Sequence, residues 1–475
     1  MQKSYVYQLV QTLEEEESTT VREWIDTPFF NRQLRDPQLV GELLGILQRD
    51  VVPTKQELNE QFFPEEGDNP NKLNKLMSEL ASLIKQFLEW NDFQQPQHDF
   101  EREMAWLKIV RKRGLLSRYQ QQLNALQKTV KKEARETVGW YYNRFLLDYE
   151  VHETQSIQNN SRGDLHLPAA IERLNAYALT HRLELLNLLL LQQKITVLDI
   201  PTTIQALNGE LPAATVAENY PLAHIFSLIY YQLSNQRPTT ESFDEILQLL
   251  DEHQDKLEEA TLQNCYAYLR NICTLLLQAG RAEYAAVLHQ IQRDNLAKGF
   301  LFYKGMLSPH AYLSVTQIAL QVGEYEWALQ FVEQYKEHLI DQGDEQENYF
   351  LLNKALCWFA QGKYEELLDI LPTQFTNISY HLTSKRLELK AYFETDSELL
   401  PYRIDSYKMY VSRASKKVIS PKIKELEKNF VNILLQLSQS PISDKERFKK
   451  IRRRIQDKIH IAEKTWLLEV TDRRI

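Results

Sequence analysis

Three similar stretches decide the fold of this chain: QAGRAEYAAVL at Gln278–Leu288, QVGEYEWALQFV at Gln321–Val332 and AQGKYEELLDIL at Ala360–Leu371. Each stretch has a glycine in the same place, and the separations between Gly280, Gly323 and Gly362 are 43 and 39 residues. Glycine adopts at little cost the positive φ with which many helices end. The three glycines therefore predict turns between paired helices, repeated along the second half of the chain.

The stretch around Gly323 is the best copy of this pattern. We expect Gly323 to end one helix, Tyr325 to lie between the two helices of the pair, and Ala328 to let them approach closely. Glycine, aromatic residue and alanine at this spacing resemble a tetratricopeptide repeat. Gly362 and Tyr364 repeat the first two positions. The resemblance implies helical hairpins stacked side by side.

The other copies depart from the family pattern. Leu367 stands where alanine is expected, and Ala282 replaces the aromatic residue. The separations also exceed the ~34 residues that are typical of the family. The repeats are therefore degenerate.

Apolar residues recur at helical spacing along the rest of the chain as well. Asn69 as cap and Pro70 as first residue predict the start of a helix with two apolar faces. Its first stripe consists of Leu73, Leu76, Leu80, Leu83 and Phe87, and its second of Met77, Ile84 and Leu88. Only 13 of 475 residues are glycine, and no sustained alternation of strand type occurs. The sequence predicts an all-α fold, an α-solenoid of degenerate tetratricopeptide-like helical hairpins.

The stretch TPFFNRQLRDP, Thr27–Pro37, places two phenylalanines in a turn between prolines. Thr20 opens a capping box, which predicts a short helix that ends before the first proline. A short helix needs tertiary contacts to be stable in water. We therefore expect Phe29 and Phe30 to fold back over this helix, and the next helix to start at Asp36.

Several classes of protein lack support in the sequence. No glycine-rich phosphate loop, nucleophile elbow or histidine pair at zinc-ligand spacing occurs, so we predict no enzyme, no cofactor and no metal. The longest apolar run, Leu183–Leu191, falls well short of the ~20 residues of a membrane span. Three cysteines without a C-x-x-C pair, and no secretory signal, favour the cytoplasm. We expect neither a membrane nor a small-molecule partner.

Charge is distributed unevenly along the chain. Arg403–Ile475 contains 19 Lys and Arg against 9 Asp and Glu, a net charge of +10, whereas the whole chain has −9. A capping box from Ser443 to Glu446 predicts a helix that docks by one apolar stripe and leaves its cations outside. The stripe consists of Phe448, Ile451, Ile455, Ile459, Ala462 and Trp466. The candidate partner-binding cations are Lys449, Lys450, Arg452, Arg453, Arg454 and Lys458.

Three further motifs extend the resemblance over most of the chain: PFFN at 28–31, the FFP turn at 62–64 before a leucine-rich helix, and IAEKTWLLE at 461–469. Together they are similar to those of a little-characterised bacterial family of tetratricopeptide-like helical proteins. The resemblance implies a helical-repeat fold. It brings no known activity, and no functional residue is carried over from it.

We expect three regions: an N-terminal helical region at 1–160, the α-solenoid at 161–402, and basic C-terminal capping helices at 403–475. The predicted function is a non-catalytic scaffold or adaptor that binds a protein partner on its helical-repeat surface. The alternative is nucleic-acid binding through the basic C-terminal helix. A third interpretation leaves these cations as a solvated face that is attracted to the acidic body.

Overall fold

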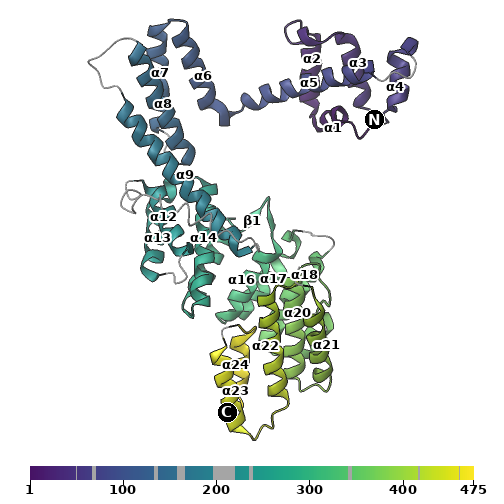
Figure 1. Ribbon diagram of the computed structural model, residues 1–475, viewed down its shortest axis with the longest axis vertical. Helices are drawn as coiled ribbons and strands as arrows, with labels where there is room; N and C mark the ends of the chain where they lie inside the picture. Colours follow the sequence, from purple (N-terminus) through teal and green to yellow (C-terminus); the bar gives the residue numbers. More distant parts are fainter. Residues whose placement is uncertain are drawn as a thin grey trace. The chain divides into compact units, whose positions relative to one another are not determined.

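The computed structural model describes residues 1–49, 51–66, 71–132, 137–157, 166–195, 220–234, 239–340, 345–415, 418–458 and 460–475. The described residues are almost entirely helical, which confirms the all-α prediction (Figure 1). The chain divides into two compact units. Unit 1 comprises Met1–Ala134 with Gly139–Tyr177, and unit 2 comprises Arg135–Val138 with Ala178–Ile475.

Unit 1 begins with a bundle around one long helix. Its elements are α1 (Tyr5–Thr12), α2 (Glu15–Asp26), η1 (Asn31–Gln33), α3 (Pro37–Leu47), α4 (Lys55–Phe62), η2 (Pro64–Glu66), α5 (Asn71–Phe93) and η3 (Pro96–His98). Helices α1 to α4 all pack against α5. Seven residues of its two predicted stripes are buried, and Leu88 is partly buried. The predicted cap at Asn69 lies outside the described residues.

Helix α2 begins earlier than predicted. It starts at Glu15 because Glu14 and Glu17 form a capping box, in which the Glu17 carboxylate accepts a hydrogen bond from the Glu14 backbone N–H at 3.0 Å. Thr20 lies inside the helix, and its hydroxyl donates to the Glu16 carbonyl at 3.0 Å. The helix dipole favours acidic side chains in the first turn. The acidic run therefore takes the role predicted for Thr20.

The phenylalanine turn folds back with only one of its two rings. Phe30 stacks on Trp24, with ring centroids 3.9 Å and planes 6° apart. Phe29 meets Phe30 edge on and is 67% exposed, so the prediction that both rings cover the helix is wrong for Phe29. Asn31 fixes the turn, because its side-chain amide donates to the Ile25 carbonyl at 2.9 Å.

Three further helices of unit 1 pack together: α6 (Asp99–Lys112), α7 (Leu116–Lys132) and α8 (Val138–Ile157). Their core includes Leu107 and Leu123, and Arg111 on α6 is paired with the buried Glu150 on α8 at 2.8 Å. Helix α9 (Leu167–Ile195) contributes residues to both units. The predicted regional boundary at residue 160 lies outside the described residues.

Unit 2 continues as a series of helical hairpins. Its further elements are α12 (Pro221–Ser234), α13 (Thr240–His253), η4 (Gln254–Lys256), α14 (Glu259–Gln278), α15 (Tyr284–Ala297), β1 (Phe302–Tyr303), β2 (Met306–Leu307), α16 (Pro309–Gln321), α17 (Tyr325–Gln334), η5 (Lys336–His338), α18 (Gln346–Ala360), α19 (Tyr364–Ile370), α20 (Ile378–Glu394), α21 (Leu400–Arg413), α22 (Pro421–Ser438), α23 (Lys445–Asp457) and α24 (Lys464–Asp472). Helices pack mainly against their neighbours in sequence, as Figure 1 shows for α20 to α24. The strands β1 and β2 form a short antiparallel hairpin.

The three repeated glycines end helices by one common geometry. Each has a positive φ, and the N–H of the following residue donates to a carbonyl five residues back in the helix, as in a Schellman motif. The φ values are 89° at Gly280, 87° at Gly323 and 75° at Gly362. These turns join α14 to α15, α16 to α17, and α18 to α19.

The hairpin turn between α20 and α21 has the same geometry and was not foreseen. Asp396 has φ 46°, and the Ser397 N–H donates to the Tyr392 carbonyl at 3.0 Å between α20 and α21. Asp396 follows Gly362 by 34 residues. Aspartate tolerates the left-handed conformation better than most residues. The predicted boundary at 402 and 403 falls inside α21, the second helix of this hairpin.

The predicted repeat residues differ in how deeply they are buried. Ala328 is fully buried in the core of the α16–α17 hairpin and its neighbours. Tyr325 is 44% exposed, so it does not fill the space between the helices as predicted. Tyr364, its counterpart, is partly buried and contacts the Phe359 ring at 5.2 Å.

Candidate partner-binding surface

The predicted basic C-terminal helix is in fact two helices, α23 and α24. Asp444 caps α23, because its carboxylate accepts a hydrogen bond from the Arg447 N–H at 3.0 Å. The cap was predicted one residue earlier, at Ser443. The prediction of one apolar stripe that continues to Trp466 is also wrong, because Glu463 has a left-handed backbone (φ 54°) immediately before α24.

The apolar residues of α23 dock it as expected. Phe448, Ile451 and Ile455 are each at most 3% exposed and belong to one core with α22 and α24. Trp466 joins the same core from α24 rather than from α23. Ile459 lies outside the described residues.

Three of the six candidate cations hold α23 onto its neighbours. Each has a partner on α22 or α24, so its charge serves the packing of the C-terminal helices. The pairs are Arg452 with Asp472 at 2.5 Å, Arg454 with Gln436 at 3.1 Å, and Lys458 with Asn429 at 2.8 Å.

The other three cations, Lys449, Lys450 and Arg453, form an outward face of α23. All three side chains are exposed and lie at helical spacing around Glu446. Lys449 donates to the Glu446 carboxylate at 2.8 Å and is the main cause of its lowered pKa, to which Lys450 and Arg453 add. We call these three residues the outward cation face.

A buried network of charges lies beneath the C-terminal helices. Arg386 on α20 donates to Glu427 at 2.6 Å and to Glu463 at 2.9 Å. Lys390 donates to the second oxygen of Glu463 at 2.7 Å, and the Tyr407 hydroxyl donates to Glu427 at 2.8 Å. The network joins α20, α21 and α22 to the residue that starts α24. Its members lie up to 77 residues apart in sequence.

The two carboxylates of the network differ in pKa. Burial tends to raise the pKa of Glu463, but Lys390 and Arg386 outweigh it and hold the pKa at about 2. Burial raises the pKa of Glu427, which has only one cation to oppose this effect. The Glu427 side chain is also less exposed, at 3% against 23% for Glu463. Glu463 is therefore charged throughout the neutral range.

We expect Glu463 to make the fold sensitive to acid. Its folded pKa of about 2 lies below the ~4.3 of an unfolded glutamate, so the unfolded state takes up the proton first as the pH falls. The stabilisation is complete above about pH 5 and is lost towards pH 2. Denaturant unfolding at a series of pH values should show a shallower decline for Glu463→Gln than for the unaltered chain. Equal slopes would contradict the assignment, because Glu427 is present in both chains.

Two further contacts explain the IAEKTWLLE motif. The Trp466 indole N–H donates to the Glu394 carboxylate at 2.9 Å, and Arg473 donates to the same carboxylate at 2.6 Å. The Trp466 ring also meets Phe393 edge on, with centroids 5.6 Å apart. The motif therefore fastens the last helix to the end of α20.

A cavity between α20 and α21 has no signal in the sequence, because its lining comes from separate helices. It has a volume of about 300 Å³, and ionisable side chains line much of it. Lys385 and Arg403 share one carboxylate, Glu388, at 3.0 and 3.3 Å. His381 lies against the Tyr410 ring, and its pKa is lowered by burial first and by Lys385 second. Two cations around one carboxylate leave this cavity positive.

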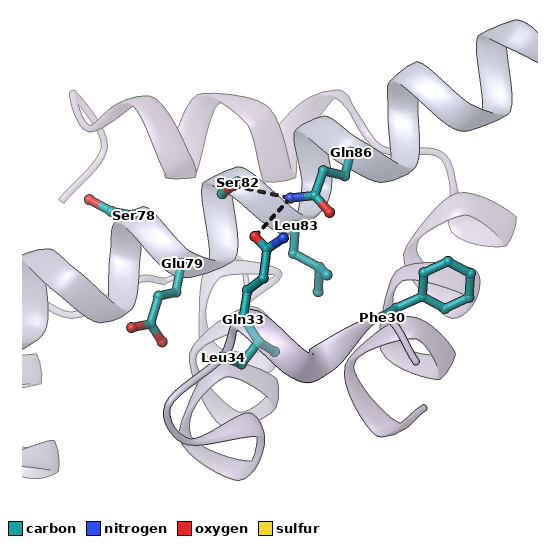
Figure 2. A pocket seen from close by; sticks show the side chains of 8 residues that line it. All are labelled: Phe30, Gln33, Leu34, Ser78, Glu79, Ser82, Leu83 and Gln86. Atoms are coloured by element: carbon teal, nitrogen blue, oxygen red, sulfur yellow. Dashed lines mark hydrogen bonds between the residues drawn. The ribbon is translucent and has the colours of Figure 1, made fainter. Parts of the chain in front are cut away.

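A smaller cavity, of about 180 Å³, lies where the phenylalanine turn meets α5. Figure 2 shows Gln33 and Gln86 pointing toward each other across it, with their amide groups 3.4 Å apart. Glu79 accepts a hydrogen bond from the Arg35 backbone N–H at 3.2 Å. These polar groups bond to one another and hold the turn on the helix.

Comparisons with known proteins give no relative for this chain. No protein-family model matches it, and no curated protein or solved structure matches it significantly. Within the described ranges, no group of three or more His, Cys, Asp and Glu side chains could hold a metal ion. No helix among the described residues is both long and apolar enough to cross a membrane.

Proposed function

We propose that this chain is a non-catalytic scaffold or adaptor whose helical hairpins stack as a right-handed α-solenoid and hold an acidic segment of a protein partner. Four consecutive hairpins of unit 2 share one turn geometry, and each packs against the next. Stacked hairpins offer an extended surface for recognition. The resemblance to the little-characterised bacterial helical-repeat family agrees with the helical-repeat fold and brings no activity of its own.

The outward cation face carries this proposal. Arg452, Arg454 and Lys458 bond to neighbouring helices. Lys449, Lys450 and Arg453 lie around Glu446 of their own helix and make no bond to another helix among the described residues. Like charges three or four residues apart on a helix repel each other, so this face costs stability. A cluster of charges that destabilises its own helix suggests that these residues bind another molecule. The positive cavity between α20 and α21 offers a second place for an acidic side chain.

The cytoplasm is the proposed place of this function. Cys265, Cys273 and Cys357 are all buried free thiols, and burial raises the pKa of each to about 12. Such thiols behave as small apolar side chains. Their state suits a reducing compartment.

Nucleic-acid binding is the second candidate, because the same three cations could contact a phosphate backbone. The net negative charge of the rest of the chain disfavours nucleic-acid binding. Residues outside 403–475 carry −19, which repels a polyanion, whereas an acidic protein segment needs only local complementarity.

The test uses the full chain and two matched variants. The triple variant Lys449→Gln, Lys450→Gln and Arg453→Gln removes the outward cation face. The variant Lys408→Gln, Arg413→Gln and Lys422→Gln removes three other exposed cations of unit 2 as a control. We expect the first variant to capture at least tenfold less of a protein partner that is cross-linked to the chain in the native cell. Each charged contact that becomes buried in an interface contributes about 1 kcal/mol or more to the binding free energy. The control should retain the partner.

Two results would count against the proposal. Capture that is equal for both variants would remove the outward cation face from the interface. Micromolar binding of oligonucleotides at ~0.15 M salt, lost in the first variant and steeply dependent on salt, would establish the nucleic-acid alternative instead.

A further inference from the structure

The α6–α7 hairpin of unit 1 has a charge pattern unlike the rest of the chain. The chain contains more acidic than basic residues, 65 against 56. Between Glu103 and Glu133, however, there is no acidic residue at all. The same stretch contains eight cations: Lys108, Arg111, Lys112, Arg113, Arg118, Lys128, Lys131 and Lys132.

Among the described residues, one of these cations makes an ion pair across the helices of the unit. Arg111 pairs with the buried Glu150 at 2.8 Å. The other seven are exposed, and Lys112, Arg113 and Arg118 flank the turn between the helices. The turn therefore has a positive surface that the structure of unit 1 does not require.

Large apolar side chains are exposed among these cations. Trp106 is 52% exposed, Ile109 43%, and Leu115 and Leu116 50% each. They are additional to the apolar face of α6, whose Met104, Leu107 and Val110 are buried against α7 and α8. Trp106 and Ile109 are three residues apart and so share the outer face of α6. Leu115 and Leu116 lie at the turn itself.

The turn lies at one end of the packed helices α6, α7 and α8. Every residue from Lys112 to Arg118 is exposed, and Gly114 reverses the chain with φ 72°. Figure 1 shows the turn at this end, and α8 finishes close to it, because the Thr154 hydroxyl donates to the Tyr119 hydroxyl at 2.6 Å. The turn therefore presents exposed apolar side chains beside exposed cations at the surface of unit 1.

We infer that this hairpin tip binds the surface of a membrane that contains anionic phospholipid. Tryptophan and leucine partition into the interface between headgroups and acyl chains, and nearby Lys and Arg are attracted to anionic headgroups. An exposed tip without a groove suits a deformable lipid surface, whereas a peptide partner is usually received in a groove. Peripheral binding needs no membrane-spanning helix. The tip would place the proposed scaffold at the membrane, independently of the outward cation face.

The test measures sedimentation of the full chain with two kinds of vesicle, phosphatidylcholine alone and phosphatidylcholine mixed with phosphatidylglycerol. We expect binding only to the mixed vesicles, with an affinity that falls as salt rises. The variant Lys112→Gln, Arg113→Gln and Arg118→Gln should bind about a hundredfold more weakly, since each cation near an anionic membrane contributes about fivefold.

The apolar contribution needs a variant of its own. Leu115→Ser with Leu116→Ser keeps every charge, and we expect at least tenfold weaker binding to the mixed vesicles. Brominated lipid should quench part of the tryptophan fluorescence, and Trp106→Phe should remove that part. The variant Lys408→Gln, Arg413→Gln and Lys422→Gln, with the same change of net charge in unit 2, should bind as the unaltered chain does.

Several outcomes would overturn the inference. These are no binding to the mixed vesicles at ~0.15 M salt, or equal loss in the unit 2 control variant. Unchanged vesicle binding by the Leu115→Ser, Leu116→Ser variant would mean that charge alone causes the binding and that the apolar tip takes no part in it. Loss of a cross-linked protein partner in the Lys112, Arg113 and Arg118 variant, without vesicle binding by the unaltered chain, would make the tip a protein interface.

Discussion

Replacing Arg386 with Met should lower the free energy of unfolding by about 3–5 kcal/mol, because the substitution strands buried carboxylates without their cation. Glu427 loses its only ion-pair partner and is 3% exposed, so water cannot replace Arg386. Glu463 keeps Lys390 but loses one of two cations. Methionine fills much of the same space, so most of the loss is electrostatic. Equilibrium unfolding in urea measures the change.

The control is Arg413→Met, which removes an exposed arginine from the end of α21. We expect it to shift the free energy of unfolding by less than about 0.5 kcal/mol. Adding Glu427→Gln to Arg386→Met should recover part of the loss, because the stranded charge is then gone. A loss of under about 1 kcal/mol for Arg386→Met alone would mean that the network contributes little to stability.

Replacing Ala328 with Leu should destabilise the α16–α17 hairpin by about 1–3 kcal/mol, because the larger side chain overpacks a filled core. Ala328 is fully buried among aromatic and aliphatic neighbours, including Tyr312 and Phe331. The matched control is Ala286→Leu on α15, where the alanine is exposed and the added methyl groups reach solvent. If both variants unfold at the midpoint of the unaltered chain, Ala328 does not occupy a close contact between helices.

Features that depend on a few neighbouring residues could be predicted from the sequence. The two apolar faces of α5 follow from spacing along one helix, and Asp36 caps α3 by accepting a hydrogen bond from the Leu39 N–H at 3.1 Å. Gly280, Gly323 and Gly362 mark their turns because glycine has the least cost at positive φ. Each of these predictions needed no knowledge of the rest of the fold.

Other features depend on residues that are distant in sequence, or on residue types that are compatible with more than one local conformation. Asp396 makes the same turn as the glycines, but aspartate is common in other settings and gave no signal. The partners of Arg452 and Lys458 come from other helices, so spacing could not separate them from the outward cation face. The break before α24 was hidden because apolar residues continue at helical spacing across it.

The fastening of α24 onto α20 bears on how copies of this chain avoid each other. Helix α24 covers apolar side chains of α20 and α22, which would be exposed without it. Trp466 lies against Phe393 and Phe430, while Glu463 and Arg473 tie the helix down through charges. A chain shortened before Ile461 would expose both phenylalanines and leave Lys390 unpaired. We therefore expect a chain shortened there to self-associate through this apolar surface.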